Sequence, residues 1–459
     1  MLLAGASVVL AVGAPALAAD LPVKAPPLKA AIVTPYSWTG WYIGANAGYG
    51  VGQGQGTLAS GLGVETFNAM PAGGFGGGQL GFNYQINSFI VLGAETDIQG
   101  AGISDTRTCL LHCVPLFSTS IDQKLNWFGT TRARIGLANG PVLTYVTAGA
   151  AYGGTETGVT TTVGTATASS TVSATKSGWT WGTGVEAALG GNWTAKAEYL
   201  YMDLGSSSAS TTIAAAGVAA PFVSTLNVKN REQIFRGGIN YHFGPDQSAA
   251  IGPTYKWAGL FVGGTFGYGI GRNDSTFVVP PAANAEAFFL SPRGFDAGGI
   301  IGYNWQFGSW VVGLDADFQG STGSGYLTCV TVCSVLGSTT IDQKLSWFGT
   351  VRGRLGYAVG PALFYATGGA AFGEVKESIA QATGAASFSH SQSGFAVGGG
   401  IENKLELFGL LGPNWTTRTE YLYVDLGSVR DTLANAQTLT SNLHEHVWRT
   451  VVSYKFGGP

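Results

Sequence analysis

Charged side chains are scarce in this chain, because only 11% of its 459 residues are Asp, Glu, Lys or Arg. An ordinary soluble protein carries about 25%. The formal net charge is −3, and no basic surface indicates nucleic acid as a partner. Long apolar runs are also missing after the N-terminal segment, which excludes a bundle of membrane-spanning helices.

Glycine and aromatic residues are abundant instead. The chain holds 72 glycines and 12% aromatic residues, and its mean hydropathy is positive, +0.20. An apolar chain without a spanning helix is typical of a β-barrel in lipid, whose strands turn their apolar face to the hydrocarbon.

The four cysteines form two close pairs, Cys109 with Cys113 and Cys329 with Cys333. In an exported protein an even number at a repeated spacing predicts disulfides, here one per half. A metal site would need further ligands beside each pair. Only His112 is adjacent, and the second pair has no matching histidine, so we expect no metal there.

The N-terminal segment predicts export. Residues 1–18 read as a secretory signal, with a mostly apolar stretch and a small-residue cleavage site at Ala16-Leu17-Ala18. Residues 19–36 contain four prolines and are expected to form an extended leader.

The rest of the chain is duplicated. Ile121-Asp-Gln-Lys-Leu-Asn-Trp-Phe-Gly-Thr130 returns, with one change, as Ile341-Asp-Gln-Lys-Leu-Ser-Trp-Phe-Gly-Thr350. Each unit is domain-sized. We predict a first barrel over 37–244, a linker over 245–256 and a second barrel over 257–459.

Side chains alternate with a period of two, which is a property of strands. In the segment 88–99, Ile90, Leu92 and Ile98 share an apolar face, and Glu95 and Asp97 lie on the other. The segment 125–138 is predicted to turn Leu125, Trp127 and Ile135 outward and Phe128, Arg132 and Arg134 inward. A charge facing mid-membrane lipid costs about 2–4 kcal/mol, so the charged face must line the barrel interior.

Charges predicted to lie in the middle of strands are balanced in each half, four acids against four bases. A buried charge is tolerated when it is paired, so we interpret both sets as interior ion-pair networks that fill narrow barrels. A selectivity lining or an acid–base site is the alternative. The first set is Glu95, Asp97, Glu186, Glu198, Arg132, Arg134, Lys196 and Arg236. The second is Asp315, Asp317, Glu402, Glu420, Arg352, Arg354, Arg418 and Arg449.

Eight strands are predicted per half, joined by short turns on one rim. The stretches 51–74, 102–123, 154–177 and 204–231 are predicted as long outer loops on the other rim. Aromatic residues are expected to form girdles at the membrane surfaces. In the first half these are Trp41, Tyr42, Trp127, Trp193, Tyr199, Tyr201, Tyr241 and Phe243.

Enzyme chemistry finds little support in the sequence. No Ser/His/Asp set recurs in both halves, and we expect no catalytic residues and no cofactor. His444-Glu445-His446 could place two imidazoles on one face of a strand, but a third metal ligand is not evident. A junction between a loop and a strand explains these histidines better.

Three motifs resemble the opacity-type outer-membrane β-barrel family of alphaproteobacteria, the Omp25/RopB group. They are Trp38-Thr-Gly-Trp-Tyr-Ile-Gly-Ala-Asn-Ala-Gly-Tyr-Gly50, Trp127-Phe-Gly-Thr-Thr-Arg-Ala-Arg-Ile-Gly136 and Lys196-Ala-Glu-Tyr-Leu-Tyr-Met-Asp-Leu-Gly205. The resemblance implies an eight-stranded barrel in the outer membrane of a Gram-negative bacterium. Family chains end on an aromatic residue that signals insertion, whereas here Gly457–Pro459 follow Phe456.

Two architectures and two functions remain open at this stage. Two tandem eight-stranded barrels, all-β and transmembrane, are favoured over one sixteen-stranded barrel, whose lumen would hold an aqueous channel. The first architecture predicts a structural or surface-interaction protein, and the second a general porin for small hydrophilic solutes. The expected partners are outer-membrane lipid, the barrel-assembly machinery during insertion and extracellular ligands of the long loops.

Overall fold

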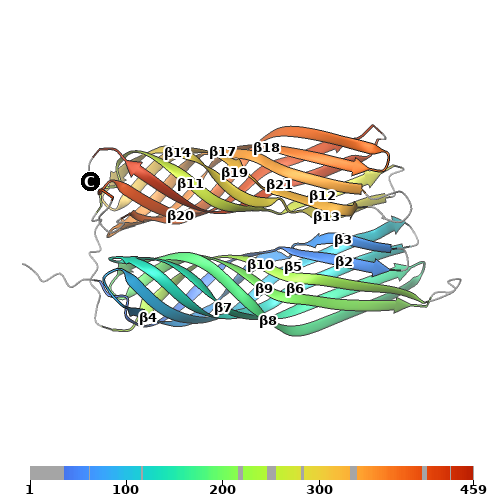
Figure 1. Ribbon diagram of the computed structural model, residues 1–459, viewed down its shortest axis with the longest axis horizontal. Coiled ribbons are helices and arrows are strands. Elements are labelled where there is room, and N and C mark those ends of the chain that lie inside the picture. The colour runs from blue at the N-terminus through green and yellow to red at the C-terminus, as the bar shows by residue number, and fades with distance from the viewer. Residues whose placement is uncertain are drawn as a thin grey trace, which may run out of the picture. The chain divides into compact units, whose positions relative to one another are not determined.

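The computed structural model describes residues 36–60, 63–114, 117–214, 221–244, 255–280, 284–330, 339–405, 411–434 and 436–457. These residues form strands joined by turns, coloured along the chain in Figure 1. Within these ranges no helix is long and apolar enough to cross a membrane. The predicted signal at 1–18 and most of the leader and linker lie outside the described residues.

The first ring of strands closes on itself. Each strand pairs with the next antiparallel neighbour, and the first strand, Gly40–Gly52, also pairs with the last, Phe222–His242. Around the ring the strands are β1 (Gly40–Gly52), β4 (Ala72–Gln85), β5 (Ile90–Val114), β6 (Phe117–Asn139), β7 (Val142–Val163), β8 (Ala166–Gly190), β9 (Trp193–Ile213) and β10 (Phe222–His242).

The second ring has the same construction. Its strands are β11 (Gly259–Gly271), β14 (Arg293–Phe307), β15 (Trp310–Ser321), β17 (Thr339–Val359), β18 (Ala362–Gln381), β19 (Gly384–Lys404), β20 (Trp415–Thr432) and β21 (Thr438–Lys455). β11 pairs with β21 and closes the ring. Because each ring has its own seam, the prediction of two eight-stranded barrels is confirmed and the sixteen-stranded alternative is wrong.

Shorter strands extend the outer end of each barrel. β2 (Gly54–Ser60) and β3 (Gly63–Ala69) form a hairpin that pairs with β10. In the second barrel β12 (Asn273–Val279) and β13 (Asn284–Leu290) repeat this hairpin on β21. β16 (Ser324–Val330) pairs mainly with β17.

The prediction of long irregular outer loops is wrong for most of their length. β8 holds 25 residues and β7 holds 22, whereas about 9–11 residues suffice to cross the membrane. These segments are rich in Thr and other small residues, and their backbones pair with the neighbouring strand along the whole length. The barrels therefore continue as strands well beyond the lipid.

The membrane-spanning part of each barrel turns its apolar side chains outward. On β5, Ile98 is 60% exposed and Leu92 is 41% exposed, whereas Glu95 and Asp97 are buried. On β15, Leu314 and Phe318 are exposed in the same way. The predicted alternation on these strands is confirmed, and the outward side chains form the face for lipid.

The predicted faces of β6 are wrong at its outer end. Leu125 is buried inside the barrel, because Asn126 is an extra residue in a β-bulge between Leu125 and Trp127. A bulge places two residues opposite one, so the inside and outside positions exchange beyond it. β17 has the same bulge at Ser346.

A second pair of bulges explains the repeated Asp-Leu-Gly motif. Gly205 and Gly427 have φ angles of 76° and 78°, a region that favours glycine. Each backbone N–H donates to the aspartate two residues earlier, at 2.8 Å for Asp203 and 2.7 Å for Asp425. The motif therefore fixes a turn of the backbone at the same height in both barrels.

The aromatic girdle needs one correction. Trp41, Trp193 and Phe243 are exposed on the outside, as a girdle requires, but Tyr42 is completely buried. Neighbouring residues of a strand point to opposite faces, so Trp41 and Tyr42 cannot both face lipid. Tyr42 belongs to the barrel interior.

Candidate functional site: the charged barrel interiors

Arg132 is the centre of the ion-pair network in the first barrel. Its Nη2 atom lies 2.5 Å from Glu95 Oε1 and 3.0 Å from Asp97 Oδ2. Its Nη1 atom lies 2.9 Å from Glu198 Oε1. Three carboxylates on β5 and β9 thus share one guanidinium from β6, which binds opposite walls of the barrel together.

Arg236 closes the network from the other side, at the seam between the first and last strands. Its Nη2 atom lies 3.0 Å from Asp97 Oδ2, and its Nε donates to Glu198 Oε2 at 2.6 Å. The remaining bases are Lys196, 2.9 Å from Glu95, and Arg134, 3.1 Å from Glu186.

The second barrel repeats the arrangement. Arg352 Nη2 lies 3.1 Å from Asp315 Oδ1 and 3.2 Å from Asp317 Oδ2, and its Nη1 lies 3.2 Å from Glu420 Oε2. The other pairs are Arg449 with Asp317 at 2.9 Å and with Glu420 at 2.6 Å, Arg418 with Asp315 at 3.3 Å, and Arg354 with Glu402 at 2.7 Å.

The structure places all sixteen predicted network residues inside the barrels, with side chains no more than 5% exposed. An isolated buried charge would be very costly, and its cost falls only when partners surround it. Each barrel meets this requirement with its own charges, four of each sign.

Several uncharged residues that the sequence did not single out complete the network. Tyr145 and Tyr365 donate to Glu198 and Glu420 at 3.0 and 2.8 Å. The period of two would have placed both tyrosines inward, two residues after the buried Leu143 and Leu363. Further donors and acceptors are Asn83 and Asn304, which accept from Arg134 and Arg354, and Thr130 and Thr350, which donate to Asp97 and Asp317.

An apolar layer covers the outer side of each network. Phe128 is fully buried and packs edge-on against Phe75 with ring centroids 5.1 Å apart. Leu125, Leu200 and Ile234 pack into the same cluster. Phe348 and Leu345 hold the equivalent layer in the second barrel. Water would have to cross both a layer of fixed ion pairs and a layer of apolar side chains.

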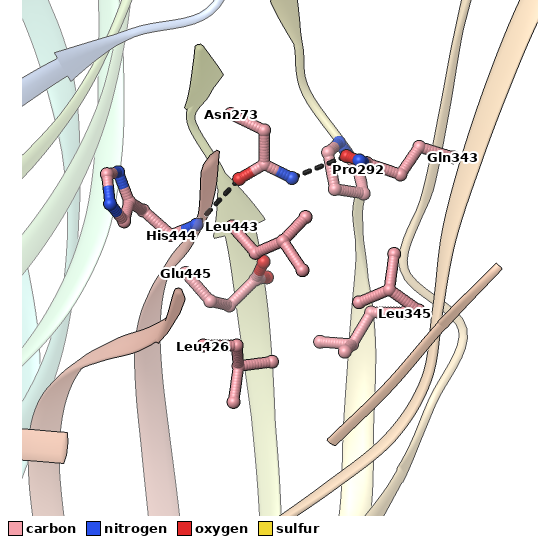
Figure 2. A pocket seen from close by; sticks show the side chains of 9 residues that line it. Asn273, Pro292, Gln343, Leu345, Leu426, Leu443, His444 and Glu445 are labelled. Carbon is pink, nitrogen blue, oxygen red and sulfur yellow. Dashed lines mark hydrogen bonds between the residues drawn. The ribbon is translucent and has the colours of Figure 1, made fainter. Parts of the chain in front are cut away.

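The space between these side chains is small. A cavity of about 10 Å³ lies beside Leu345, Leu443 and Glu445 in the second barrel (Figure 2). The first barrel has a cavity of the same volume beside Leu125, Leu204 and Glu232. Such a volume holds about one water molecule, so neither cavity is a channel.

A buried tryptophan seals the inner end of each barrel. Trp38 and Trp257 are 0% and 1% exposed. Trp38 Nε1 donates to the carbonyl of Gly140 at 3.0 Å, which ties the chain before β1 to the turn between β6 and β7. Each barrel interior is thus covered at its inner end as well as filled at its centre.

Both halves of the chain match the same protein family. The model of the family described as "Outer membrane protein beta-barrel domain" matches residues 4–243 and again residues 225–456. The chain belongs to this family. Each of the two matches takes in one closed ring of eight strands, so this family member is a tandem duplicate.

Curated relatives of this outer-membrane barrel are similar over one barrel's length. The 31 kDa outer-membrane immunogenic protein of Brucella melitensis is 39% identical over 198 residues, 41% of this chain and 81% of the relative. The 22 kDa outer membrane protein of Rhizobium leguminosarum is 32% identical over 185 residues, 40% and 70%. The 25 kDa outer-membrane immunogenic protein of B. melitensis is 30% identical over 206 residues, 45% and 82%. These relatives are outer-membrane proteins, and the predicted outer-membrane location is confirmed.

The other candidate sites of this outer-membrane barrel are less organised. His446 hydrogen-bonds to Tyr421 at 2.8 Å, and His444 lies 3.5 Å from Asp425, whereas Glu445 faces the interior. Among the described residues no three His, Cys, Asp or Glu side chains cluster as metal ligands would. The cysteines Cys109, Cys113, Cys329 and Cys333 have side chains outside the described residues, so the disulfides stay a prediction.

Proposed function

We propose that the chain is a structural and surface-interaction protein of the outer membrane, whose filled barrels anchor outer extensions. The observation that carries the proposal is the double closure of each interior. Arg132 and Arg352 hold opposite walls together with ion pairs, and Phe128 and Phe348 cover these pairs with apolar packing.

The same closure argues against a general porin. A porin needs a hydrated lumen, and eight strands enclose a space that side chains can fill. Its charged residues would have to face water, yet here they neutralise each other at contact distances. No repeated set of nucleophile and base accompanies the network, so its chemistry is that of a salt-bridged core rather than of an enzyme.

Single-channel conductance of the refolded mature chain in a planar bilayer tests the proposal. We expect a silent or barely conducting membrane, with insertion proved by protease protection of the membrane-spanning strands. A sixteen-stranded general porin, refolded in the same way, serves as the conducting control. Large and stable openings by the chain would overturn the proposal and favour solute passage.

The structural role has its own readout in cells. A strain that lacks the chain is expected to become more sensitive to detergent and to recover with the wild-type chain. A variant with both barrels intact but with the outer extensions replaced by short turns separates the two parts of the proposal. It should restore detergent resistance and lose the surface interactions.

A further inference from the structure

The outer interior of the second barrel contains two buried carboxyl groups that belong to no ion-pair network. Glu377 on β18 and Asp431 on β20 are 1% and 2% exposed. Both lie about 15 residues from the inner ends of their strands, beyond the 9–11 residues that cross the membrane. No lysine or arginine contacts either carboxyl group among the described residues.

A chain of hydrogen bonds leads from β21 to Glu377, and Figure 2 draws its part from His444 to Gln343. The backbone N–H of His444 donates to Asn273 Oδ1 at 2.7 Å, and Asn273 Nδ2 donates to Gln343 Oε1 at 2.5 Å. Gln343 Nε2 then donates to Glu377 Oε1 at 2.6 Å. These hydrogen bonds fix the orientation of the side-chain amides of Asn273 and Gln343. As a result, an N–H group of Gln343 points at one oxygen of Glu377.

His390, which binds Asp431, pairs across the ladder with Val375, two residues from Glu377, so the two carboxyl groups lie on the same inner face. Glu377 Oε2 and Asp431 Oδ2 are both buried and have no hydrogen-bond partner among the described residues. Two carboxylates are both acceptors, so a hydrogen bond between them requires a shared proton. Burial and then the neighbouring Asp431 raise the pKa of Glu377 to about 8, although hydrogen bonds from Gln343 and Ser441 act in the opposite direction. At neutral pH the pair therefore holds one proton.

His390 on β19 connects the pair to solvent. Its Nε2 lies 2.7 Å from Asp431 Oδ1, and its side chain is 26% exposed. The other strands around the pair contribute the neutral groups Gln343, Ser441 and Asn273. β13 adds the buried carboxyl group of Glu286 at the height of Asp431. The imidazole thus offers a proton a path between Asp431 and solvent.

The first barrel lacks this pair of carboxyl groups. Its buried Glu65 on β3 lies at the same height, but it corresponds to Glu286 on β13 of the second barrel. Thr157 stands at the position of Glu377, and Ala209 at that of Asp431, since Ala209 pairs with Leu226 as Asp431 pairs with Leu439. Ala174 takes the place of His390. The outer core around Ala209 consists of Leu58, Ile121 and other apolar residues.

We propose that Glu377, Asp431 and His390 form a proton-operated lock that holds the outer end of the second barrel closed at neutral pH and loosens it at alkaline pH. While the proton is shared, it joins β18 to β20. When it leaves through His390, two negative carboxylates remain side by side in a buried space, and they repel each other.

The direction of the pH effect follows from the pKa of Glu377. Between its ordinary value of 4.5 and about 8, the folded form keeps a proton that the unfolded form releases. The stability of the outer end therefore falls as the pH rises through this window, and the loss is complete above about 8. The first barrel should show no matching loss.

Infrared spectroscopy of the full chain in a bilayer tests the shared proton directly. The carbonyl stretch of a protonated carboxyl group should disappear with a midpoint near 8, and Glu377→Gln should remove this titration. Glu374→Gln is the matched control, because Glu374 lies on the same strand with a 26% exposed side chain. Asp431→Asn provides a second variant should Glu377→Gln fail to insert.

Cleavage by proteinase K tests whether the outer end of the second barrel loosens. At each pH the cleavage rate is divided by that of the unfolded chain, which corrects for the pH dependence of the protease. From about one unit below to one unit above the pKa of Glu377, cleavage at the outer ends of β18–β20 should rise several-fold. The rise should vanish in Glu377→Gln and persist in Glu374→Gln. An unchanged carboxyl titration in Glu377→Gln would overturn the proposal, as would an equal rise at the outer end of the first barrel.

Discussion

The two barrels are nearly the same where they cross the membrane and different where they leave it. Both place three carboxylates around one arginine, Arg132 or Arg352, and both cover them with a phenylalanine. Above this level both barrels contain an apolar cluster, but the second barrel adds Glu377 and Asp431 where the first has Thr157 and Ala209. The comparison teaches that the filled interior is the common requirement and the outer core is free to differ.

Removing the central arginine should have the largest effect and should be the same in both barrels. Arg132→Met leaves three carboxylates buried around a neutral side chain, which should cost about 3–5 kcal/mol. Arg352→Met should do the same to the second barrel alone. Hydrogen exchange of the intact chain in urea, read by mass spectrometry for β6 and β17 separately, measures each loss.

The outward Arg430, which is exposed, gives the matched control for this comparison. Arg430→Met should leave exchange in both barrels unchanged. If Arg132→Met loosened both barrels equally, the two networks would not be independent.

Removing a side chain from the apolar layer should have the next largest effect on stability. Phe128→Ala removes a fully buried ring and should cost about 3–5 kcal/mol of stability. It should not open a conducting path, because the ion-pair layer beneath it remains. Urea unfolding measures the first effect and bilayer conductance the second. Ile98→Ala, on the lipid face of the same barrel, serves as the control, and steady openings in Phe128→Ala would show that the ion pairs alone do not close the lumen.

A smaller effect should separate the two interiors. Tyr42 donates to Glu95 Oε2 at 2.8 Å, whereas the second barrel has Phe261 at this place, against the guanidinium groups of Arg354 and Arg418. Tyr42→Phe makes the first barrel resemble the second and should cost about 1.5–3 kcal/mol, because a hydrogen bond to a charged acceptor is lost. Urea unfolding measures it against Tyr84→Phe, whose ring is 57% exposed.

The bulge glycines should give the smallest effect, again equal in both barrels. Gly205→Ala and Gly427→Ala force alanine into a positive φ and should each cost roughly 1–2 kcal/mol. Gly237→Ala, where the added methyl group would meet its nearest atom at 3.8 Å, controls for the loss of a glycine. Thermal unfolding in detergent measures all three. Equal losses at Gly205 and Gly237 would mean that the backbone angle does not matter.

The sequence predicts the membrane-spanning part of each barrel well, because the alternation of side chains between lipid and interior dominates there. Lipid on one side and a narrow interior on the other force strict alternation, so the positions of Glu95, Asp97, Arg132 and Arg134 follow from their strand faces. Eight strands per half follow from the same rule.

The errors occur where that rule is interrupted. One extra residue, Asn126, exchanges inside and outside, and nothing in the composition of the segment 125–138 marks the bulge. Residue type groups Tyr42 with Trp41 in a girdle, but the alternation of strand faces puts the two side chains on opposite sides. Composition does not separate the outer strands from loops, because Thr and other small residues occur in both, and only their ladder partners distinguish the two. The pairing of Glu377 with Asp431 joins strands that are far apart along the chain, and no local pattern reports it.

The length of the strands has a consequence for what the cell presents to its surroundings. With β8 at 25 residues, its outer part rises roughly 35–40 Å beyond the lipid, at about 3.3 Å per residue and a tilt of about 40°. Any molecule that approaches the cell from outside therefore meets the outer ends of these strands before it meets the bilayer. Substitutions at those outer ends leave the ion pairs and the apolar layer untouched, so the surface that faces outward can change independently of the residues that hold the barrel together.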